Sequence, residues 1–200
     1  TYERHYSHIL EKAQELLRRI DAEHLHGNKA LLSISGSAGM GLADSCGVPF
    51  VQEVFATRVA ANRLAPGTDV IIELGGEDAK IIYFKGGLEE RMNGVCAGGT
   101  GSFIDQMAAL LQTDASGLDR EAAHYQQIYP IAARCGVFAK TDIQPLINEG
   151  ATKADLAASI FQAVVNQTIS GLACGKPIRG HVAFLGGPLH FLPQLKAAFI

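Results

Sequence analysis

Apolar residues recur with helical spacing from the beginning of the chain. Over residues 7–20 they occupy positions 9, 10, 13, 16, 17 and 20, and this repeat predicts an amphipathic helix. Thr152 and Asp155 have the spacing of a capping box at the start of a long apolar stretch. The same pattern predicts helices over residues 50–64, 102–111, 116–125, 142–149 and 156–174, and one that runs to the end of the chain.

Short apolar runs bounded by glycine predict the strands. Because these runs alternate with the helices, the pattern predicts an α/β fold. The glycine-rich residues 36–41 are either a plain connection or the rim of a ligand cleft. The expected strands cover residues 31–35, 70–74, 80–84 and 181–185, and a further one leads from the bend at residues 85–87 to about residue 92.

Composition narrows the class of protein. Of the 200 residues, 48% are apolar and 18% are charged, which is enough apolar content for a soluble globular chain with a sizeable core. The net charge is −3 and no basic run stands out, so nucleic acid and anionic membranes are not expected as partners. No apolar run approaches the roughly 20 residues of a membrane span, and the first residues lack the layout of a secretory signal. We therefore expect a cytoplasmic protein.

Three glycine turns follow or lie beside the apolar strands. A single Gly-Gly after a strand is usually only a tight turn, but three in this order favour a nucleotide site, because free backbone N–H groups can surround phosphate oxygens. Neither a Walker-type phosphate loop nor a Rossmann fingerprint is present to explain them. The turns comprise Gly75-Gly76, residues 97–101 and Gly186-Gly187-Pro188.

Cysteine placement adds a second chemistry. The four cysteines, at positions 46, 96, 135 and 174, form no CxxC pair. Cys96 stands just before a glycine loop, so one segment could hold both a soft metal and an anion. Two isolated thiolates would need the rest of a metal site from a distant segment or from a second subunit. Spacing alone favours small buried residues for all four, and this is our interpretation of Cys46 and Cys174.

Four segments resemble one protein family. Residues 71–81 (IIELGGEDAKI) look like a second phosphate motif and residues 182–189 (VAFLGGPL) like an adenosine motif, while residues 92–103 and 133–142 look like two cysteine segments. Together they resemble the ATP-dependent activators of 2-hydroxyacyl-CoA dehydratases and benzoyl-CoA reductases, within the actin, sugar kinase and Hsp70-like ATPase superfamily.

The resemblance implies an actin-like, ribonuclease H-like ATPase fold with a mixed sheet flanked by helices. Residues 1–68 would be the remainder of an N-terminal lobe and residues 69–200 the C-terminal lobe. The family's first phosphate motif, which lies on an N-terminal hairpin, is absent from the sequence. We therefore expect the chain to be a piece of a longer protein.

The resemblance also implies an iron–sulfur function. Cys96 and Cys135 would be ligands of a 4Fe–4S cluster shared between two protomers of a homodimer, or between related domains. The activity would be ATP hydrolysis coupled to donation of one low-potential electron to a dehydratase or acyl-CoA reductase, with reduced ferredoxin or flavodoxin as the donor. The chain would then be an ATPase that uses ATP or ADP, Mg²⁺ and the cluster.

The nucleotide site implied by the motifs is centred on Glu73, where the superfamily commonly has Asp. We assign Glu73 to the Mg²⁺ shell or the attacking water. Lys80 either faces phosphate or lies in solvent, and Asp105 either contacts the nucleotide or supports the first turn of its helix. The remaining nucleotide-binding residues are Gly75, Gly76, Gly98, Gly99, Thr100, Gly101, Gly186, Gly187 and Pro188.

Two other functions are compatible with the sequence. The chain could be an actin-like ATP-binding kinase or scaffold lobe without a cluster, in which case Cys96 would tolerate replacement by Ser or Ala. It could also be a non-catalytic lobe whose activity depends on sequence outside it. Iron content separates the activator from the first alternative, and nucleotide binding by an N-terminally extended version, but not by this chain, would indicate the second.

Overall fold

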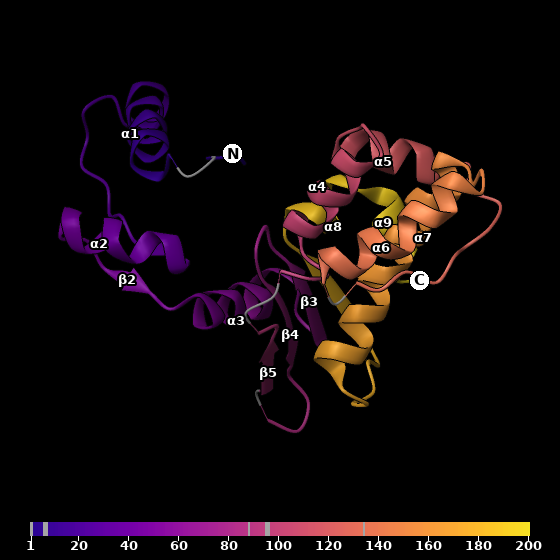
Figure 1. The fold of residues 1–200 in the computed structure, drawn as a ribbon. Coiled ribbons are helices and arrows are strands. Elements are labelled where there is room, and N and C mark those ends of the chain that lie inside the picture. The colour runs from indigo at the N-terminus through magenta and orange to yellow at the C-terminus, as the bar shows by residue number, and fades with distance from the viewer. Residues whose placement is uncertain (1, 6–7, 88, 95–96, 134) are drawn as a thin grey trace. The chain divides into compact units, whose positions relative to one another are not determined.

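The structure is a computed structural model that describes residues 2–5, 8–87, 89–94, 97–133 and 135–200. The chain divides into two compact units, Thr1–Pro66 and Gly67–Ile200 (Figure 1). Each unit is described below by itself. Cys96, one of the two expected cluster ligands, lies outside the described residues.

The first unit combines helices with a small parallel pair of strands, in which Ile34 lies opposite Phe50. The predicted helix near the N-terminus is confirmed over its described residues, and it continues into a π-helical turn. The elements are α1 (Ile9–Ile20), η1 (Asp21–Leu25), β1 (Ile34–Ser35), η2 (Ser37–Gly39), α2 (Met40–Cys46), β2 (Phe50–Val51) and α3 (Glu53–Leu64).

Predictions in this unit need correction. The strand expected over residues 31–35 is limited to Ile34–Ser35, and residues 36–41, expected as a plain connection or the rim of a cleft, contain η2 and the first residues of α2. The helix expected over residues 50–64 begins only at Glu53, since Phe50 and Val51 pair with β1 instead. Gln52 marks this boundary, because its side-chain oxygen accepts the N–H of Phe55 at 3.0 Å and caps the helix.

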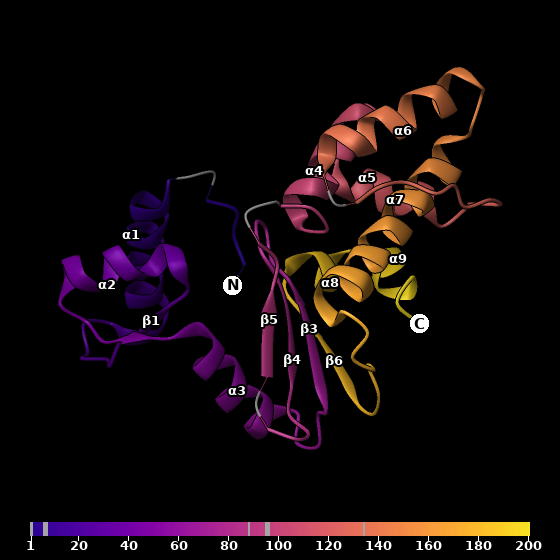
Figure 2. The ribbon, with the colours of Figure 1, turned by 60° about the horizontal axis from the view of Figure 1, so that its bottom comes forward.

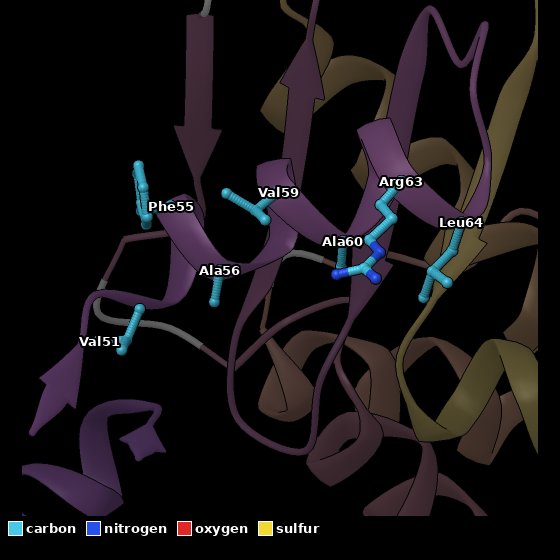
Figure 3. A pocket seen from close by; sticks show the side chains of 7 residues that line it. All are labelled: Val51, Phe55, Ala56, Val59, Ala60, Arg63 and Leu64. Atoms are coloured by element: carbon cyan, nitrogen blue, oxygen red, sulfur yellow. The ribbon is translucent and has the colours of Figure 1, made fainter. Parts of the chain in front are cut away.

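An open apolar groove lies in the first unit. It encloses about 590 Å³, and Arg63 is the one charged residue in its lining, as Figure 3 shows. Among the described residues of this unit Ala43 is the one that is fully buried, so the unit has a small core. The groove is lined by Val51, Phe55, Ala56, Val59, Ala60, Arg63 and Leu64.

The second unit is built on a four-stranded mixed sheet. Its order is β5-β4-β3-β6, and Figure 2 shows the strands side by side in this order. Strands β3, β4 and β5 are antiparallel neighbours, whereas β6 runs parallel to β3. The four predicted strands of this region are confirmed to within one or two residues, apart from the less defined start of β5. They are β3 (Val70–Leu74), β4 (Ala79–Tyr83), β5 (Glu89–Met92) and β6 (Val182–Leu185).

The helices of the second unit pack on this sheet and on one another. The long apolar stretch near residue 160 forms α7 and ends in the π-helical η3, and the hydroxyl oxygen of Thr152 accepts the N–H of Asp155 at 3.1 Å, as the capping pattern predicts. The helical elements are α4 (Gly101–Leu110), α5 (Ala115–Ala122), α6 (Gly136–Asn148), α7 (Lys153–Gln167), η3 (Thr168–Ala173), α8 (Gly187–Phe191) and α9 (Pro193–Ala197).

Two helix predictions in this unit need correction. Helix α6 begins at Gly136 and not at residue 142. The sequence pattern missed its first turn because the apolar Val137 and Phe138 are 70% and 64% exposed, so they do not mark the buried face of the helix. The single helix expected at the end of the chain is two short ones. The residue before a proline avoids the helical conformation, and Leu192, with φ −115° and ψ 86°, accordingly separates α8 from α9.

One face of the sheet forms the main core. Residues at alternate positions of β3 and β4 share this face and belong to one core cluster with residues of α4, α5 and α7. Lys153–Ala173 has the length and mean hydropathy, 1.2, of a membrane-spanning helix, but 67% of its apolar window is buried, which is typical of a core helix. Central core residues are Val70, Ile72, Leu74, Ile81, Phe103, Ile104, Leu118, Leu156, Ile160 and Phe161.

The prediction that Cys46 and Cys174 are buried was wrong. Both are exposed. Cys46 is the last residue of α2, and Cys174 follows η3 in a left-handed conformation with φ 46°. Both thiols therefore lie at helix ends on the surface of their units, and not in the core.

Candidate functional site

The end of β3 is joined directly to the start of α4. The N–H of Gly75 donates to the carbonyl oxygen of Asp78 at 2.8 Å and closes the turn between β3 and β4. The N–H groups of Gly101 and Ser102 donate to the carbonyl oxygens of Gly75 and Gly76, at 2.9 and 2.7 Å. Two of the three glycine turns therefore form one hydrogen-bonded unit.

The third glycine turn reaches the same place through β6. Gly186 has φ +90°, and a Cβ on it would lie 2.0 Å from the carbonyl oxygen of Leu74, the last residue of β3. A Cβ on Gly101 would lie 3.3 Å from Pro188 Cγ. The structure thus brings Gly75-Gly76, Gly101 and Gly186 to Pro188 together at the carboxyl end of β3, as expected for turns that share one ligand.

Two carboxylates and a buried ammonium group lie beside this junction. Glu73 on β3 is opposite Lys80 on β4, and the distance from Lys80 Nζ to Glu73 Oε1 is 3.8 Å. Lys80 Nζ lies 2.9 Å from Asp78 Oδ2. The Lys80 side chain is 4% exposed, so of the two alternatives left by the sequence, the solvent position does not apply.

Asp78 was missed by the sequence interpretation. Its carbonyl oxygen closes the turn at Gly75 and its carboxylate pairs with Lys80. The available signal was its place within the same motif, two residues after Gly76 and two residues before Lys80. A hairpin turn brings such positions together, and this follows from the expected hairpin once the two strands are paired.

Residues 98–100 of the glycine loop before α4 are buried. Thr100 is fully buried, and its hydroxyl donates to the carbonyl oxygen of Ala97 at 2.5 Å. A Cβ on Gly99 would lie 3.1 Å from Gln167 Cγ, so the loop packs against the end of α7, and Gly98 is buried with it. Asp105 is half-buried in the second turn of α4.

Cys135 lies at the start of α6. It is half-buried and extended, with φ −149° and ψ 131°, and its carbonyl oxygen accepts the N–H of Ala139 at 3.0 Å. Helix α6 packs on α4 here, and a Cβ on Gly136 would lie 2.6 Å from Gln106 Oε1. Within the part of the chain that the structure describes, no three His, Cys, Asp or Glu side chains gather as a metal site.

A second charged network lies at the edge strand β5. Lys176 and Arg91 bind the Glu89 carboxylate and hold its pKa below the usual range. The Arg91 guanidinium also donates to the carbonyl oxygens of Leu172 and Ala173 at the end of η3. Burial raises the pKa of Tyr83, whose ring lies 4.2 Å from Lys176 Nζ.

This geometry can be compared with known proteins. Residues 17–198 match the model of the BadF/BadG/BcrA/BcrD ATPase family. The chain belongs to this family. The resemblance inferred from the glycine and cysteine segments is therefore confirmed.

Individual members of the BadF/BadG/BcrA/BcrD family show the same relationship. The (R)-2-hydroxyglutaryl-CoA dehydratase activating ATPase of Acidaminococcus fermentans is 30% identical over 169 residues, which are 82% of this chain and 65% of that protein. The chain thus spans just under two thirds of the length of this curated relative.

Solved structures of the family agree with the fold. The crystal structure of component A of the A. fermentans (R)-2-hydroxyglutaryl-CoA dehydratase matches with a TM-score of 0.82 at 26% identity, over 94% of this chain and 72% of that one. The 2-hydroxyisocaproyl-CoA dehydratase activator of Clostridium difficile with bound ADPNP matches with a TM-score of 0.79 at 25% identity, over 93% and 70%. The expected actin-like α/β ATPase fold is confirmed.

Proposed function

We propose that this chain is the ATP-binding and cluster-binding part of an activator that hydrolyses ATP and donates a low-potential electron to an acyl-CoA dehydratase or reductase. The observation that carries the proposal is the junction of Gly75, Gly101 and Pro188 at the end of β3. Family membership supports ATP as the ligand of that junction, and a relative of this fold binds ADPNP.

The nucleotide would lie against the three turns. A Cβ on Gly76 would meet nothing within 4 Å, so the turn leaves open space beside its backbone, where phosphate oxygens can approach. Glu73 and Asp78 offer carboxylate oxygens, the donors that Mg²⁺ prefers. We assign Glu73 to the Mg²⁺ shell or to the attacking water, because phosphoryl transfer depends mainly on positioning and charge neutralisation.

Lys80 has a supporting role in this proposal. Its ammonium group is buried and lies between the two carboxylates, 2.9 Å from Asp78 and 3.8 Å from Glu73. It therefore neutralises part of their charge when the site holds no Mg²⁺ and fixes the direction of both side chains. Direct contact with phosphate is not needed for this role.

The cluster would be held by thiolates at the ends of helices. Cys135 supplies sulfur, the donor that iron–sulfur clusters take, and it stands at the positive end of a 13-residue helix, which favours a negatively charged group. Cys96 would be the second ligand of this chain. A second protomer or a related domain would supply the other two thiolates. When bound, the cluster supplies a one-electron redox centre.

Helix α4 connects the two halves of the site. Its first residue is hydrogen-bonded to the turn at Gly75, and Gln106 one turn later packs on Gly136 beside Cys135. A shift of the glycine turns on nucleotide binding would therefore act on the cysteine helix through a short packed path. This arrangement supports coupling between the nucleotide state and electron transfer.

The alternative function is an ATP-binding kinase or scaffold lobe of the same fold, without a cluster. The junction of glycine turns supports it equally, because that junction needs no thiolate. The two functions differ in whether Cys135 and Cys96 bind iron.

Anaerobic purification with iron and sulfide assays and a visible spectrum tests the choice. We expect a brown protein with about four irons per two chains, and loss of iron in Cys96→Ala and Cys135→Ala. Cys174→Ala is the matched control, because this thiol is also at a helix end but exposed. A colourless, iron-free protein after reconstitution would overturn the cluster and leave the lobe without redox function.

A further inference from the structure

The segment that leads to Cys135 is held by side chains. Residues 125–133, between α5 and α6, form neither helix nor strand in the structure. Their backbone N–H groups nevertheless have acceptors, at Gln126, Gln127, Tyr129 and Ala132. A backbone N–H that loses its acceptor in a partly buried position costs free energy, so these acceptors determine the path of the segment.

Helix α7 supplies the acceptors for the first part of the segment. Asp155 Oδ1 accepts the N–H groups of Gln126 and Gln127 at 2.7 and 2.9 Å. One turn further along the helix, Ser159 Oγ accepts the N–H of Tyr129 at 2.8 Å and donates to the carbonyl oxygen of Asp155 at 2.6 Å. Both side chains are buried, so this part of the segment is fixed to the core.

Helix α6 supplies the last acceptor itself. Asp142 Oδ2 accepts the N–H of Ala132 at 2.9 Å. Ala132 precedes Cys135 by three residues, and Asp142 follows it by seven, in the second turn of the helix that Cys135 begins. The next residue, Ala133, is 6% exposed and belongs to the main core.

We propose that Asp142 is a positioning residue for Cys135, because its carboxylate holds the incoming chain against the same helix that Cys135 caps. Asp155 and Ser159 fix the preceding residues, and Asp142 holds Ala132, which follows them. The proposal rests on the proposed cluster, for which the orientation of the thiolate matters: metal ligands depend on hydrogen bonds from their surroundings, and the loss of such support typically weakens metal binding about 10- to 100-fold.

The first test measures the position of Cys135 without any cluster. In a chain carrying Cys46→Ser, Cys96→Ser and Cys174→Ser, the rate of reaction with a thiol reagent reports on Cys135 alone, and hydrogen exchange reports on the Ala132 N–H. We expect Asp142→Ala to speed exchange at Ala132 and to change the thiol rate several-fold. Asp142→Asn keeps an acceptor oxygen, so it should recover much of the parent behaviour.

Asp114→Ala is the matched control. The Asp114 carboxylate also accepts a backbone N–H, that of Gly117 at 2.6 Å, but it caps α5 and is not part of the segment. We expect the parent thiol rate in this variant. If exchange at Ala132 and the thiol rate are the same in Asp142→Ala as in the parent, the inference is overturned. If Asp142→Ala does not fold, Asp142→Leu replaces it, because leucine is close in size to aspartate but offers no acceptor oxygen, and parent rates in that variant overturn the inference.

The second test uses the chain with its native cysteines after anaerobic reconstitution. Loss of iron to a chelator should be about tenfold faster in Asp142→Ala than in the parent, with an altered electron paramagnetic resonance spectrum of the reduced protein and no change in Asp114→Ala. An equal rate and spectrum would overturn the role of Asp142. A parent without iron would overturn the proposed function instead, and the thiol measurement would still report on Asp142.

Discussion

Gly101 lies against Gly75, and the contact would be tight even for a Cβ. The N–H of Gly101 donates to the carbonyl oxygen of Gly75 at 2.9 Å, and a Cβ on Gly101 would approach the same oxygen to 3.1 Å. The first residue of α4 is thus fixed to the turn after β3. This contact places the positive end of a helix beside a turn whose backbone is open to a ligand.

Gly101→Ala should weaken nucleotide binding more than it weakens the fold. The new Cβ would lie 3.1–3.3 Å from Gly75, Gly76 and Pro188, so these two neighbouring turns must give by a few tenths of an ångström. We expect about tenfold weaker ADP binding by calorimetry, equivalent to about 1.4 kcal/mol. Unchanged affinity in a folded variant would contradict the assignment of this junction to the nucleotide.

Gly186→Ala should instead affect stability. Its φ of +90° disfavours any side chain, and the new Cβ would lie 2.0 Å from the carbonyl oxygen of Leu74. We expect the free energy of unfolding to fall by about 2–4 kcal/mol in urea titrations. Gly41→Ala is the control, because a Cβ at that helical position meets nothing within 4 Å. Equal stability of the two variants would show that the β3–β6 junction is looser than described.

Lys80→Met should destabilise the second unit by about 2 kcal/mol, because Asp78 and Glu73 lose a buried counter-charge. Adding Asp78→Asn should recover part of the loss, which a double-mutant cycle of urea unfolding would measure. Lys12→Met is the exposed counterpart: its pair with Glu15 spans 2.7 Å at the surface, and exposed pairs contribute little to stability. Similar losses for Lys80→Met and Lys12→Met would argue against a buried pair.

Acid should release the segment that leads to Cys135. The N–H groups of Gln126 and Gln127, followed by the Thr152 hydroxyl, hold the pKa of Asp155 below its ordinary value of 3.8. The ionised carboxylate is therefore favoured by folding, so its contribution to stability is present above pH 3.8 and is lost as the pH falls through the lower folded pKa. Urea unfolding from pH 7 to pH 3 would measure this.

Asp155→Asn is the informative variant for that titration. It should be less stable than the parent at pH 7, and its stability should fall less steeply in acid. Asp44→Asn, at an exposed position of α2, serves as the control and should follow the parent. Parallel curves for the parent and Asp155→Asn would mean that Asp155 does not contribute through its charge.

The sheet and its turns were the predictable part of the molecule. Runs such as residues 70–74 are apolar, short and bounded by Gly75-Gly76, so their length and their end can be inferred from local chemistry. The start of α6 could not be inferred in this way. Val137 and Phe138 are apolar residues on its exposed face, so apolar and polar positions do not separate into two faces there. Helix α2 was missed because glycines at 39 and 41 flank its first residue.

Contacts between distant residues were the unpredictable part of the site. The pairing of Asp142 with the Ala132 N–H, or of Asp155 with Gln126, depends on how a segment without regular structure lies on two helices. No local pattern specifies such a path, because any Asp on a helix surface can equally face water. The exposure of Cys46 and Cys174 could not be predicted for a similar reason, because burial depends on packing and not on composition.

The charged edge strand β5 has a consequence for how the protein behaves in a crowded solution. An exposed strand edge offers unpaired backbone groups on which another chain can add. Here Glu89 and Arg91 lie on the same face of the edge strand, where they are bound to each other, to Lys176 and to the end of η3. A strand from a neighbouring molecule would have to displace these ionic contacts and bring its own side chains against charge. Ordered aggregation through this side of the sheet is therefore disfavoured in the folded state.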